Sequence, residues 1–518
     1  MFQSELIAPV PELLERQATA QGERIAFRDA RSAVTYADLE AVTGRLAGHL
    51  ADLGVQPGES VAIFLPNSVE WVESCLAVVR AGGVAVPISY DATAGEVAYR
   101  LADAGCRAVV TTDERVALLD GLRGEVPEAI APILVERGPE RAAETPGGLR
   151  FAELAAREPA SAPRDPRDID VPAFILYTSG TTGRAKGVLL TVHGMLWVTA
   201  ACWAPLAGLA RDDTVLSPLP LFHSYALNLS VLSILAVGAS EYLMEKYSTG
   251  EAVRLLQSGA YSFFPGVPTM FHYFLQATQQ QPGLRFPALR VCVSAGAIMP
   301  ATLNREFEER FGVPLLDGYG ITETSTMVTM NPLGAERVPG SCGPALPGLE
   351  VRIVDPLSGA EVPAGAEGEL IVRGPNVMLG YHDKPAETAA ALRDGWYHTG
   401  DLAKRDAAGF ITITGRLKEL IIRGGQNIAP AEIEEVVNLW EEVLDCAVVG
   451  MAHEHLGEVP ALFVVAQPER AVDVEALLAH CRTYLSAYKV PALVRLVEEI
   501  PRTGSGKIIR FRLKETLE

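Results

Sequence analysis

One stretch of the chain reads Tyr177-Thr178-Ser179-Gly180-Thr181-Thr182-Gly183-Arg184-Ala185-Lys186-Gly187. It holds three glycines, four small hydroxyl residues and two cations; the apolar segment 171–176 ahead of it reads as a buried strand, and the apolar segment 188–191 follows it. Glycines let backbone N–H groups crowd around an anion, hydroxyls donate further hydrogen bonds, and Arg184 or Lys186 supplies positive charge. The stretch therefore predicts a phosphate-binding loop. It lacks the Walker spacing, and a flexible surface turn is the alternative interpretation.

Length, composition, net charge and cysteine usage narrow the class of protein to which the chain can belong. A chain of 518 residues with 48% hydrophobic and 21% charged residues predicts an enzyme of roughly two to four domains. Its net charge of −20 argues against nucleic acid or an anionic membrane as a standing partner. We find no signal-peptide pattern and no apolar run of membrane-spanning length, so no stable membrane insertion is expected. Seven scattered cysteines without C-x-x-C spacing predict a reduced, cytoplasmic protein without disulfides or zinc.

Strand and helix patterns alternate along most of the chain and predict an α/β fold. Two subdomains with parallel sheets are expected at about 1–160 and 171–339, joined by a loop rich in proline and charge. Residues 340–415 alternate short strands with Gly/Pro turns, which predicts a small β-barrel. The tail, 418–518, reads as a small α+β domain. Helices of the second subdomain are predicted at 193–206, 226–236, 250–258, 268–277 and 300–310.

The motif T-S-G-T-T-G-x-x-K-G resembles the signature loop of the adenylate-forming superfamily, which comprises acyl-CoA synthetases, luciferases and peptide-synthetase adenylation domains. Ordered motifs continue to Lys507, so the resemblance covers nearly the whole chain. It implies an N-terminal adenylation core, residues 1–417, and a mobile C-terminal domain. One departure is Ala185, at a position where the family usually has proline. The residues implied in binding the ATP phosphates are Thr178, Ser179, Gly180, Thr181, Thr182, Gly183 and Lys186.

Two further motifs resemble the family's nucleotide site. Ser294-Ala295-Gly296-Ala297 is similar to the turn that flanks adenine, and Ala295 and Gly296 are assigned to it. The motif Asp317-Gly318-Tyr319-Gly320-Ile321-Thr322-Glu323 follows. A tyrosine beside glycines can lay its ring on adenine, and Asp317 can accept from the exocyclic amine. The resemblance places Thr322 at the α-phosphate and gives Glu323 as a hard oxygen ligand for Mg²⁺. An isolated Thr-Glu pair would normally be a solvated surface feature.

A third group of motifs lies in the last quarter of the chain. Asp401, in a Thr-Gly-Asp motif, resembles the residue that accepts from both ribose hydroxyls. Arg416 matches the residue that contacts ribose or phosphate, and Lys418 falls at the family's hinge. Gly425 would let a pantetheine arm pass the backbone, with an ordinary turn glycine as the alternative. Lys507, in a Gly/Ser run that would otherwise read as a solvated tail, matches the lysine that enters the active site during adenylation.

The acid pocket is expected around Pro218 to Leu229. His223 matches an aromatic residue that lines the carboxylate site, although a single histidine is usually structural. Amino-acid-activating relatives carry an aspartate here to pair the substrate ammonium, and burying that cation unpaired would cost roughly 3–5 kcal/mol. We therefore disfavour α-amino acids, and dicarboxylic acids too, because no Arg or Lys stands in these stretches. The other pocket residues are assigned as Tyr225, Asn228, Phe264, Gly266, Val267 and Ile321.

The function predicted is that of an AMP-forming ligase using ATP, Mg²⁺ and CoA. A hydrophobic carboxylic acid, with a fatty acid favoured, would be adenylated and then transferred to the CoA thiol. An aryl acid of the coumarate or benzoate type is an alternative, and so is transfer to a carrier-protein phosphopantetheine supplied in trans. A luciferase-type oxidase and a binding protein with a decayed site are hypotheses of other classes. The protein is expected to be a monomer or homodimer.

Overall fold

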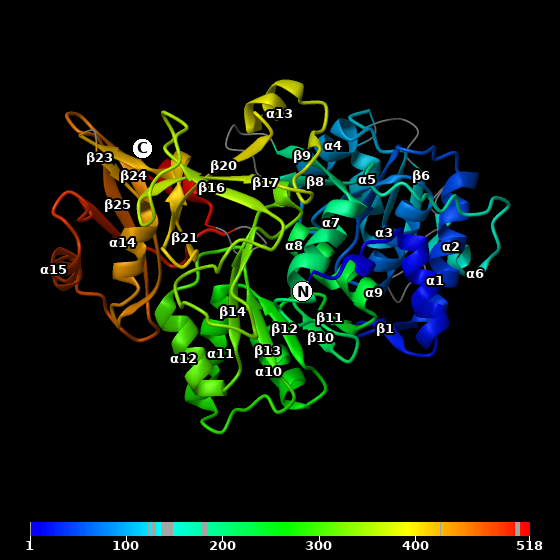
Figure 1. Cartoon of the computed structure of the whole chain (residues 1–518), viewed down its shortest axis with the longest axis horizontal. Helices are drawn as coiled ribbons and strands as arrows, with labels where there is room; N and C mark the ends of the chain where they lie inside the picture. Colours follow the sequence, from blue (N-terminus) through cyan, green and yellow to red (C-terminus); the bar gives the residue numbers. More distant parts are fainter. Residues whose placement is uncertain are drawn as a thin grey trace.

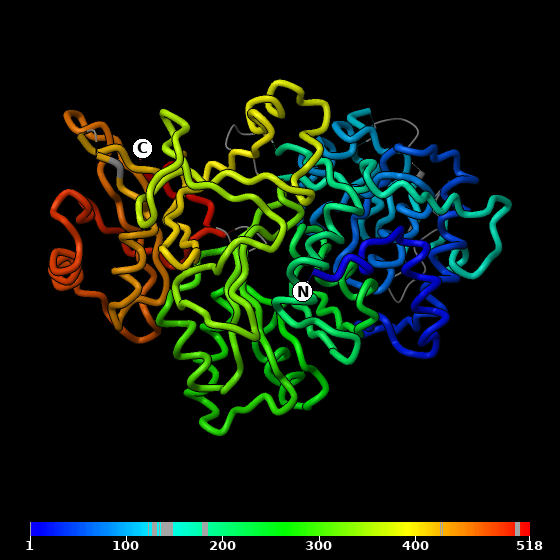
Figure 2. Tube along the Cα trace, viewed as in Figure 1, coloured from blue at the N-terminus to red at the C-terminus, as the bar shows by residue number. Residues whose placement is uncertain are grey.

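The computed structural model describes residues 2–122, 124–126, 131–135, 149–178, 185–424, 426–502 and 508–517. Figures 1 and 2 show three regions side by side: the early part of the chain (blue to cyan), a central region (green to yellow) and the C-terminal region (orange to red). Within the described residues, two eight-stranded sheets dominate the first two regions. The fold class predicted from the sequence, α/β with a small C-terminal domain, is confirmed.

Sheet 1 has the strand order β18-β9-β8-β4-β3-β5-β6-β7. Its neighbouring strands are parallel except at β8–β9 and β9–β18. Its central strands are buried along their whole length, as expected for a sheet covered on both faces. The strands are β3 (Ser60–Phe64), β4 (Val84–Pro87), β5 (Ala108–Thr112), β6 (Ala131–Val135), β7 (Leu149–Arg150), β8 (Pro172–Thr178), β9 (Lys186–Thr191) and β18 (Gly380–Tyr381).

Sheet 2 has the order β15-β14-β13-β12-β10-β11-β1-β2 and is parallel except at its two edges. The strands are β1 (Ile25–Arg28), β2 (Ala33–Thr35), β10 (Thr214–Ser217), β11 (Ser240–Leu243), β12 (Phe263–Gly266), β13 (Val291–Ser294), β14 (Leu315–Tyr319) and β15 (Thr329–Met330). The sheets therefore do not follow the predicted subdomain boundaries. Strands β1 and β2 lie in sheet 2, and strands β8 and β9 lie in sheet 1, because strands join partners that are distant in sequence.

One apolar core joins the two sheets. It contains side chains from both sheets and from the helices packed between them. Those helices are η1 (Ser4–Leu6), α1 (Val10–Gln21), α2 (Tyr36–Asp52), α3 (Val69–Arg80), α6 (Phe151–Ala156), α7 (Val192–Val198), α8 (Ser224–Leu227) and α9 (Ile234–Val237). Hydroxyl side chains cap two of them, Thr35 at the start of α2 and Ser68 at the start of α3.

The outer faces of the sheets are covered separately. Helices α10 (Thr249–Gln257), α11 (Pro268–Gln280) and α12 (Ala301–Phe311) pack on sheet 2 through an aromatic cluster. Helix α4 (Ala94–Asp103) and α5 (Val116–Gly121), which follows the short turn η2 (Asp113–Arg115), cover sheet 1. A reciprocal capping box between Thr93 and Glu96 fixes the start of α4.

Two predicted helices differ from expectation in their middle turns. The segment predicted at 193–206 is α7 followed by a π-helical turn, η3 (Thr199–Trp203). The segment predicted at 226–236 is interrupted by a second π-helical turn, η4 (Asn228–Ser233), between α8 and α9. Each π turn widens the backbone spiral by one residue, which hydrophobic periodicity does not reveal. Polar side chains join the turns, since Thr199 Oγ1 lies 2.8 Å from Ser233 Oγ.

The region predicted as a β-barrel is a curled antiparallel sheet. Its path runs β16 (Glu350–Val354), β17 (Glu367–Arg373), β20 (Trp396–Arg405) and β19 (Leu392–Arg393), and β21 (Ile411–Arg416) pairs with the other end of β20. Among the described residues no strand pairing joins β16 to β21 and closes the sheet into a barrel. Helix α13 (Pro385–Ala391) precedes β19, and the short turn η5 (Thr322–Thr324) connects β14 to β15.

The C-terminal region has its own sheet and core. A 3₁₀ turn, η6 (Leu417–Glu419), links β21 to this region. The sheet consists of β22 (Ile421–Arg423), β23 (Gln426–Ile428), β24 (Val443–His453), β25 (Gly457–Ala466) and β26 (Leu493–Leu496), and the helices are α14 (Pro430–Val437), α15 (Val474–Tyr484) and α16 (Arg510–Glu515). Apolar clusters on both faces hold them together. The predicted division at residue 418 coincides with η6, although the domain bounds themselves stay a prediction.

The lengths of the helices and the state of the cysteines bear on two general expectations. In the part of the chain that the structure describes, every helix is too short or too polar to cross a membrane. All seven cysteines are buried free thiols.

Candidate active site

Asp401, Arg416 and Tyr319 form one corner of the candidate site. Asp401 and Arg416 face each other on β20 and β21, and Arg416 Nε lies 2.8 Å from Asp401 Oδ1. The Tyr319 hydroxyl, from the end of β14, donates to Asp401 Oδ2 at 2.5 Å. Asp401 is only 2% exposed, and it raises the pKa of Arg416. Burial, followed by the neighbouring carboxylate, raises the pKa of Tyr319 well above its usual range. Three residues predicted to bind the nucleotide are thus in direct contact.

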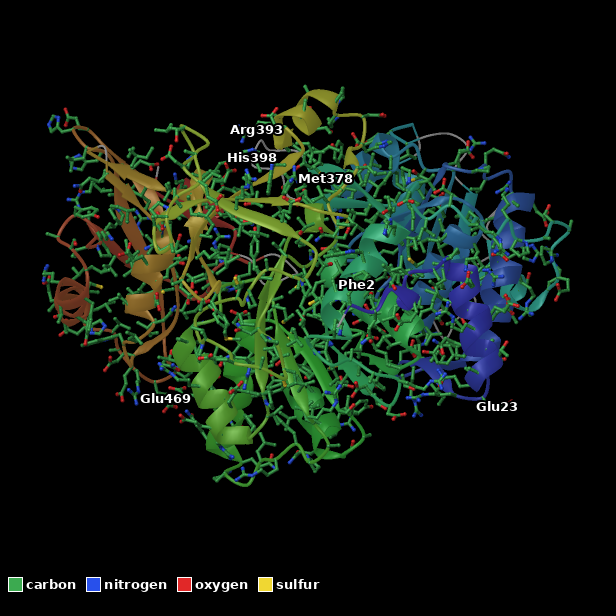
Figure 3. All side chains as sticks on the ribbon, in the orientation of Figure 1. Phe2, Glu23, Met378, Arg393, His398 and Glu469 are labelled. Atoms are coloured by element: carbon green, nitrogen blue, oxygen red, sulfur yellow. The ribbon has the colours of Figure 1, made fainter. Side chains whose placement is uncertain are left out.

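Glu369 holds the irregular stretch of β20 that carries Asp401, and sequence reasoning missed it. Its carboxylate contacts His398 Nδ1 at 2.9 Å and accepts from the Gly400 N–H at 3.1 Å. Arg393 lies 3.8 Å away, and Figure 3 shows Arg393 and His398 together at this edge of the sheet. Gly400 has φ of +70°, a conformation suited to glycine. The available signal was a glutamate inside an otherwise buried apolar strand, β17.

The predicted adenine turn lies beside this corner. Ser294 and Asp317 are paired at the carboxyl ends of β13 and β14, so Ala295 and Gly296 follow directly next to Asp317. Gly296 has φ of +86°. Burial raises the pKa of Asp317 well above its usual range. Gly318 has a packing role here, because a Cβ would lie 2.4 Å from Met327 Cε.

A polar cavity of about 70 Å³ adjoins Asp317. Arg337 and Glu308 form an ion pair on its wall. The Asn331 side-chain amide donates to the carbonyls of Asp317 and Ser341. Apart from Asp317, none of the lining residues was predicted, because they come from α12, β14 and the segment after β15 and carry no motif. The lining is Asn304, Glu308, Leu315, Asp317, Asn331, Arg337, Val338, Pro339, Gly340 and Ser341.

Lys186 and Glu323 are brought together by a tyrosine that sequence reasoning also missed. Lys186 Nζ lies 5.0 Å from the centre of the Tyr381 ring, a cation–π distance. The Tyr381 hydroxyl donates to Glu323 Oε1 at 3.1 Å. Tyr381 reaches this position because β18 pairs with β9 directly after the predicted phosphate loop. The backbone N–H of Met378, labelled in Figure 3, donates to the Glu323 carbonyl. The Lys186 cation and the Glu323 carboxylate therefore both contact the side chain of Tyr381.

His223 and Thr322 lie around the start of α8. His223 is the N-cap residue of α8, and its ring packs on Phe222 with centroids 4.3 Å apart. The Ser224 hydroxyl is 3.4 Å from Thr322 Oγ1, and its carbonyl accepts from Thr326 Oγ1 at 2.9 Å. The His223 loop thus contacts the segment that carries Thr322 and Glu323, as a shared site requires.

The residues predicted for the acid pocket separate into two sets. Tyr225, Val267 and Ile321 all pack on the core between the sheets, and Tyr225 stacks on Trp203 at 5.7 Å. Gly266 ends β12 against the rings of Phe264 and Phe271. Phe264 points to the opposite face of sheet 2, into the aromatic cluster with Phe271 and Phe274.

Asn228 is also a packing residue in this structure. Its side-chain oxygen accepts from Trp203 Nε1 at 2.5 Å, and its amide nitrogen donates to the Met195 carbonyl at 2.7 Å. The side chain is completely buried. These contacts tie the two π turns together, so Asn228 stabilises the helices under the candidate pocket.

The predicted hinge lies between two ion pairs. Lys418 is exposed in the middle of η6. On one side, Arg416 pairs with Asp401 of the curled sheet. On the other, Glu419 Oε2 lies 2.9 Å from Arg510 Nε in the C-terminal region.

Seven predicted site residues lie outside the described residues. They are Ser179, Gly180, Thr181, Thr182, Gly183, Gly425 and Lys507. Thr178 ends β8 on the near side of the predicted loop. Arg502 and Ile508, on either side of the segment that carries Lys507, form a β-bridge, and Arg502 pairs with Asp445 at 2.8 Å.

The chain is similar to known enzymes over nearly its whole length. Residues 14–382 match the model of the AMP-binding enzyme family, and residues 432–507 match the AMP-binding enzyme C-terminal domain. A feruloyl-CoA synthase from Amycolatopsis sp. is 36% identical over 96% of this chain and 97% of its own length. A long-chain-fatty-acid–CoA ligase from Yersinia pestis is 34% identical over 97% of this chain and 93% of its own. ATP-bound MatB from Rhodopseudomonas palustris superposes with a TM-score of 0.88, at 32% identity over 98% of both chains.

The chain belongs to the AMP-binding enzyme family, that is, to the adenylate-forming superfamily. Use of ATP and CoA is expected for a CoA ligase of this family. The protein is an AMP-forming acyl-CoA synthetase.

Proposed function

We propose that this enzyme activates a hydrophobic carboxylic acid as an acyl-adenylate and transfers the acyl group to the thiol of CoA. The observation that carries the proposal is the convergence of two groups of polar residues. Tyr319, Asp401 and Arg416 offer a ribose site. Lys186, Tyr381 and Glu323 offer charge for the phosphates. The loop of His223 touches the segment between them.

The first half-reaction needs charge neutralisation more than proton transfer. A carboxylate is already ionised at pH 7, so it attacks the α-phosphorus without a general base, and pyrophosphate leaves. Its barrier is the approach of two anions, which positioned cations and donors lower. We assign that role to Lys186 and Lys507, with Thr322 at the α-phosphate and His223 at the acid carboxylate.

Glu323 suits a magnesium ion that is shared with the substrate. Mg²⁺ commonly takes only one or two protein carboxylates and completes its shell with phosphate oxygens and water. Glu323 is half-buried beside Lys186, with one oxygen accepting from Tyr381. Bound there, the ion would neutralise phosphate charge.

The second half-reaction requires a different arrangement of the C-terminal domain. We propose that rotation at Lys418 withdraws Lys507 and brings Gly425 beside the pantetheine arm. The thiol then attacks the mixed anhydride and AMP leaves. The ion pairs of Arg416 and Glu419 with opposite domains would confine the rotation to Leu417 and Lys418.

The acid is proposed to be apolar, with a fatty acid favoured. Tyr225, Val267 and Ile321 give the candidate pocket an apolar character. The relatives include both a feruloyl-CoA synthase and a long-chain-fatty-acid–CoA ligase. An aryl acid is the second candidate, because the ring of Tyr225, which stacks on the buried Trp203, offers a flat aromatic surface.

The remaining proposals concern partners and surroundings. Free CoA is the proposed acceptor, with a carrier protein acting in trans as the alternative. We propose a cytoplasmic enzyme of fatty-acid metabolism that is a monomer or homodimer.

A panel of acids tests the proposed function. AMP and pyrophosphate release would be measured with short, medium and long fatty acids, cinnamic and benzoic acids, malonate and amino acids, each with and without CoA. Release of AMP that rises with CoA for fatty acids is the expected result. Release of AMP with aryl acids alone would mean that the substrate is an aryl acid and not a fatty acid. Pyrophosphate release that CoA leaves unchanged would point to another acceptor, and no release with any acid would contradict the proposal.

A further inference from the structure

Helix α4 presents two polar side chains to the base of the predicted phosphate loop. Tyr99 and Asp103 are four residues apart, so they project from the same face of the helix. The capping box at Thr93 and Glu96 fixes the other end of α4. At the carboxyl end, His382 Nε2 lies 3.1 Å from the Asp103 carbonyl, and Lys384 Nζ lies 3.7 Å from Asp103 Oδ1. The start of the helix is thus fixed by its own capping box, and its carboxyl end is held by the segment that follows β18.

Asp103 anchors the strand that leads into the loop. The Tyr177 hydroxyl donates to Asp103 Oδ2 at 2.7 Å. Tyr177 is the penultimate residue of β8 and comes directly before Thr178. Burial, followed by this hydrogen bond, raises the pKa of Tyr177, so the hydroxyl remains a donor.

Tyr99 anchors the chain where it leaves the loop. Its hydroxyl donates to the Ala185 carbonyl at 2.8 Å, and its ring packs edge-on against Tyr177, with centroids 6.0 Å apart. Ala185 is followed immediately by Lys186. Because alanine does not fix its own φ as proline would, a contact from outside the loop has to set the direction of the backbone here.

From these contacts we infer that Tyr99 is a positioning residue for adenylation, which acts by fixing the Ala185 carbonyl and thereby the place of Lys186 over Tyr381. The inference rests on the proposed role of Lys186. With Asp103 on Tyr177, the two contacts hold both ends of the predicted loop at the spacing set by one helical turn of α4. ATP, a polyphosphate, is the ligand whose binding depends on them.

The hydrogen bond donated by the Tyr99 hydroxyl is weak, but it should affect one defined property, the position of Lys186. A typical hydrogen bond contributes about 0.5–1.5 kcal/mol, which corresponds to about 2- to 12-fold in an equilibrium. Removing it frees Lys186 to occupy positions away from the phosphates. The effect should therefore appear in the KM for ATP and not in the reaction of CoA with the adenylate.

The test is the variant Tyr99→Phe, which deletes the hydroxyl and keeps the ring against Tyr177. We expect the KM for ATP in pyrophosphate release to rise about 3- to 10-fold, with thioester formation from preformed acyl-adenylate within about twofold of wild type. Tyr90→Phe is the matched control, because it removes a hydroxyl bonded to Thr112 in the same region. That control should leave the KM for ATP within about twofold of wild type.

A double-mutant cycle with Lys186→Ala separates positioning from general destabilisation. If Tyr99 acts through Lys186, then Tyr99→Phe changes ATP affinity by less than about twofold once Lys186 is alanine. An unchanged KM in Tyr99→Phe, or effects that add fully in the double variant, would overturn the inference. Should wild type release no pyrophosphate, the proposed function fails, and calorimetric ATP binding by the same four proteins still decides the role of Tyr99.

Discussion

The two sides of the η6 turn are held by similar ion pairs set in very different surroundings. On the N-terminal side, Arg416 pairs with Asp401, a carboxylate buried in the curled sheet and also bound by Tyr319. On the C-terminal side, Glu419 pairs with Arg510. Arg510 also contacts both oxygens of Glu434 and donates to the Val448 carbonyl at 2.8 Å.

The difference separates ligand binding from motion. The N-terminal ion pair belongs to the proposed ribose site, so it stays with the nucleotide whatever the C-terminal domain does. The C-terminal ion pair ties the hinge to α16, only three residues beyond Lys507. Substitutions in the ion pair of Arg416 and Asp401 should therefore change ATP binding. Substitutions in the ion pair of Glu419 and Arg510 should change the turnover number.

The largest effect is expected from Lys507→Ala. Loss of one preorganised charge in the transition state costs on the order of 3–4 kcal/mol, or about 10²- to 10³-fold in the rate of adenylation. Thioester formation from preformed acyl-adenylate should survive, since that step needs Lys507 removed. Rapid-quench assays of the two half-reactions measure the split. Lys514→Ala, which removes a surface ion pair with Glu458, is the control. Equal loss in both half-reactions would contradict the assigned role.

The second-largest effect is expected from Asp401→Asn, which should weaken the binding of ATP. A hydrogen bond to a charged group contributes about 1.5–3 kcal/mol, so we expect the KM for ATP to rise about 10- to 100-fold. Steady-state kinetics with varied ATP measure this change. Asp394→Asn is a control in the same sheet, because Asp394 is exposed at φ of +51°, where asparagine is well tolerated. A normal KM in Asp401→Asn would exclude the ribose role.

Glu419→Gln should have a smaller effect of a different kind. It keeps the shape of the side chain and removes the charge that faces Arg510, so it loosens the C-terminal side of the hinge. We expect kcat of the complete reaction to fall about 3- to 10-fold with the KM for ATP unchanged, from a loss of about 1 kcal/mol. Glu435→Gln, an exposed neighbour on α14, controls for the change in net charge. A raised KM with normal kcat would mean that both sides of the hinge serve the nucleotide.

The smallest effect is expected from a substitution of Glu73 in the N-terminal region, and it concerns stability alone. Burial, with Glu70, Asp29 and Asp38 nearby, raises the pKa of Glu73 to about 8. The folded state therefore holds a proton that the unfolded state releases above pH 4.5, and stability falls as the pH rises from about 4.5 to 8. Glu73→Gln should raise Tm by a few degrees at pH 8.5 and change it little at pH 5.

Differential scanning calorimetry at both pH values measures the Glu73 effect. If the C-terminal region unfolds separately, only the N-terminal transition should move. Glu153→Gln, exposed on α6, is the control. A shift of the same size at pH 5 would show that the raised pKa is not the cause.

Several polar residues predicted for the candidate site lie in contact with one another, whereas two of the predicted pocket residues, Phe264 and Asn228, lie elsewhere. Asp317 and Tyr319 lie in β14 and Asp401 lies in the middle of β20, each in a glycine-containing motif, and Tyr319 contacts Asp401 directly. Phe264 and Asn228 came from apolar stretches, where sequence does not tell which face of a strand or helix points to a ligand. Both are packing residues in the structure.

Partners that are distant in sequence explain the other differences. The assignment of residues 172–191 to the second subdomain missed that β8 pairs with β4. Tyr381 and Glu369 carry no motif of their own, and their roles arise from pairing with β9 and from burial within β17. Local periodicity predicts a strand but not its neighbour.

The pairing of β9 with β18 has a consequence for how the protein is made. Translation delivers β9 roughly 190 residues before β18, and β1 more than 200 residues before its neighbour β11. At about 5–20 residues per second, the ribosome needs on the order of ten seconds or more to supply each missing strand. During that interval nascent chains expose bare β edges that can pair with other chains. Fragments that stop before Tyr381 keep such an edge permanently, so a truncated core should include this strand.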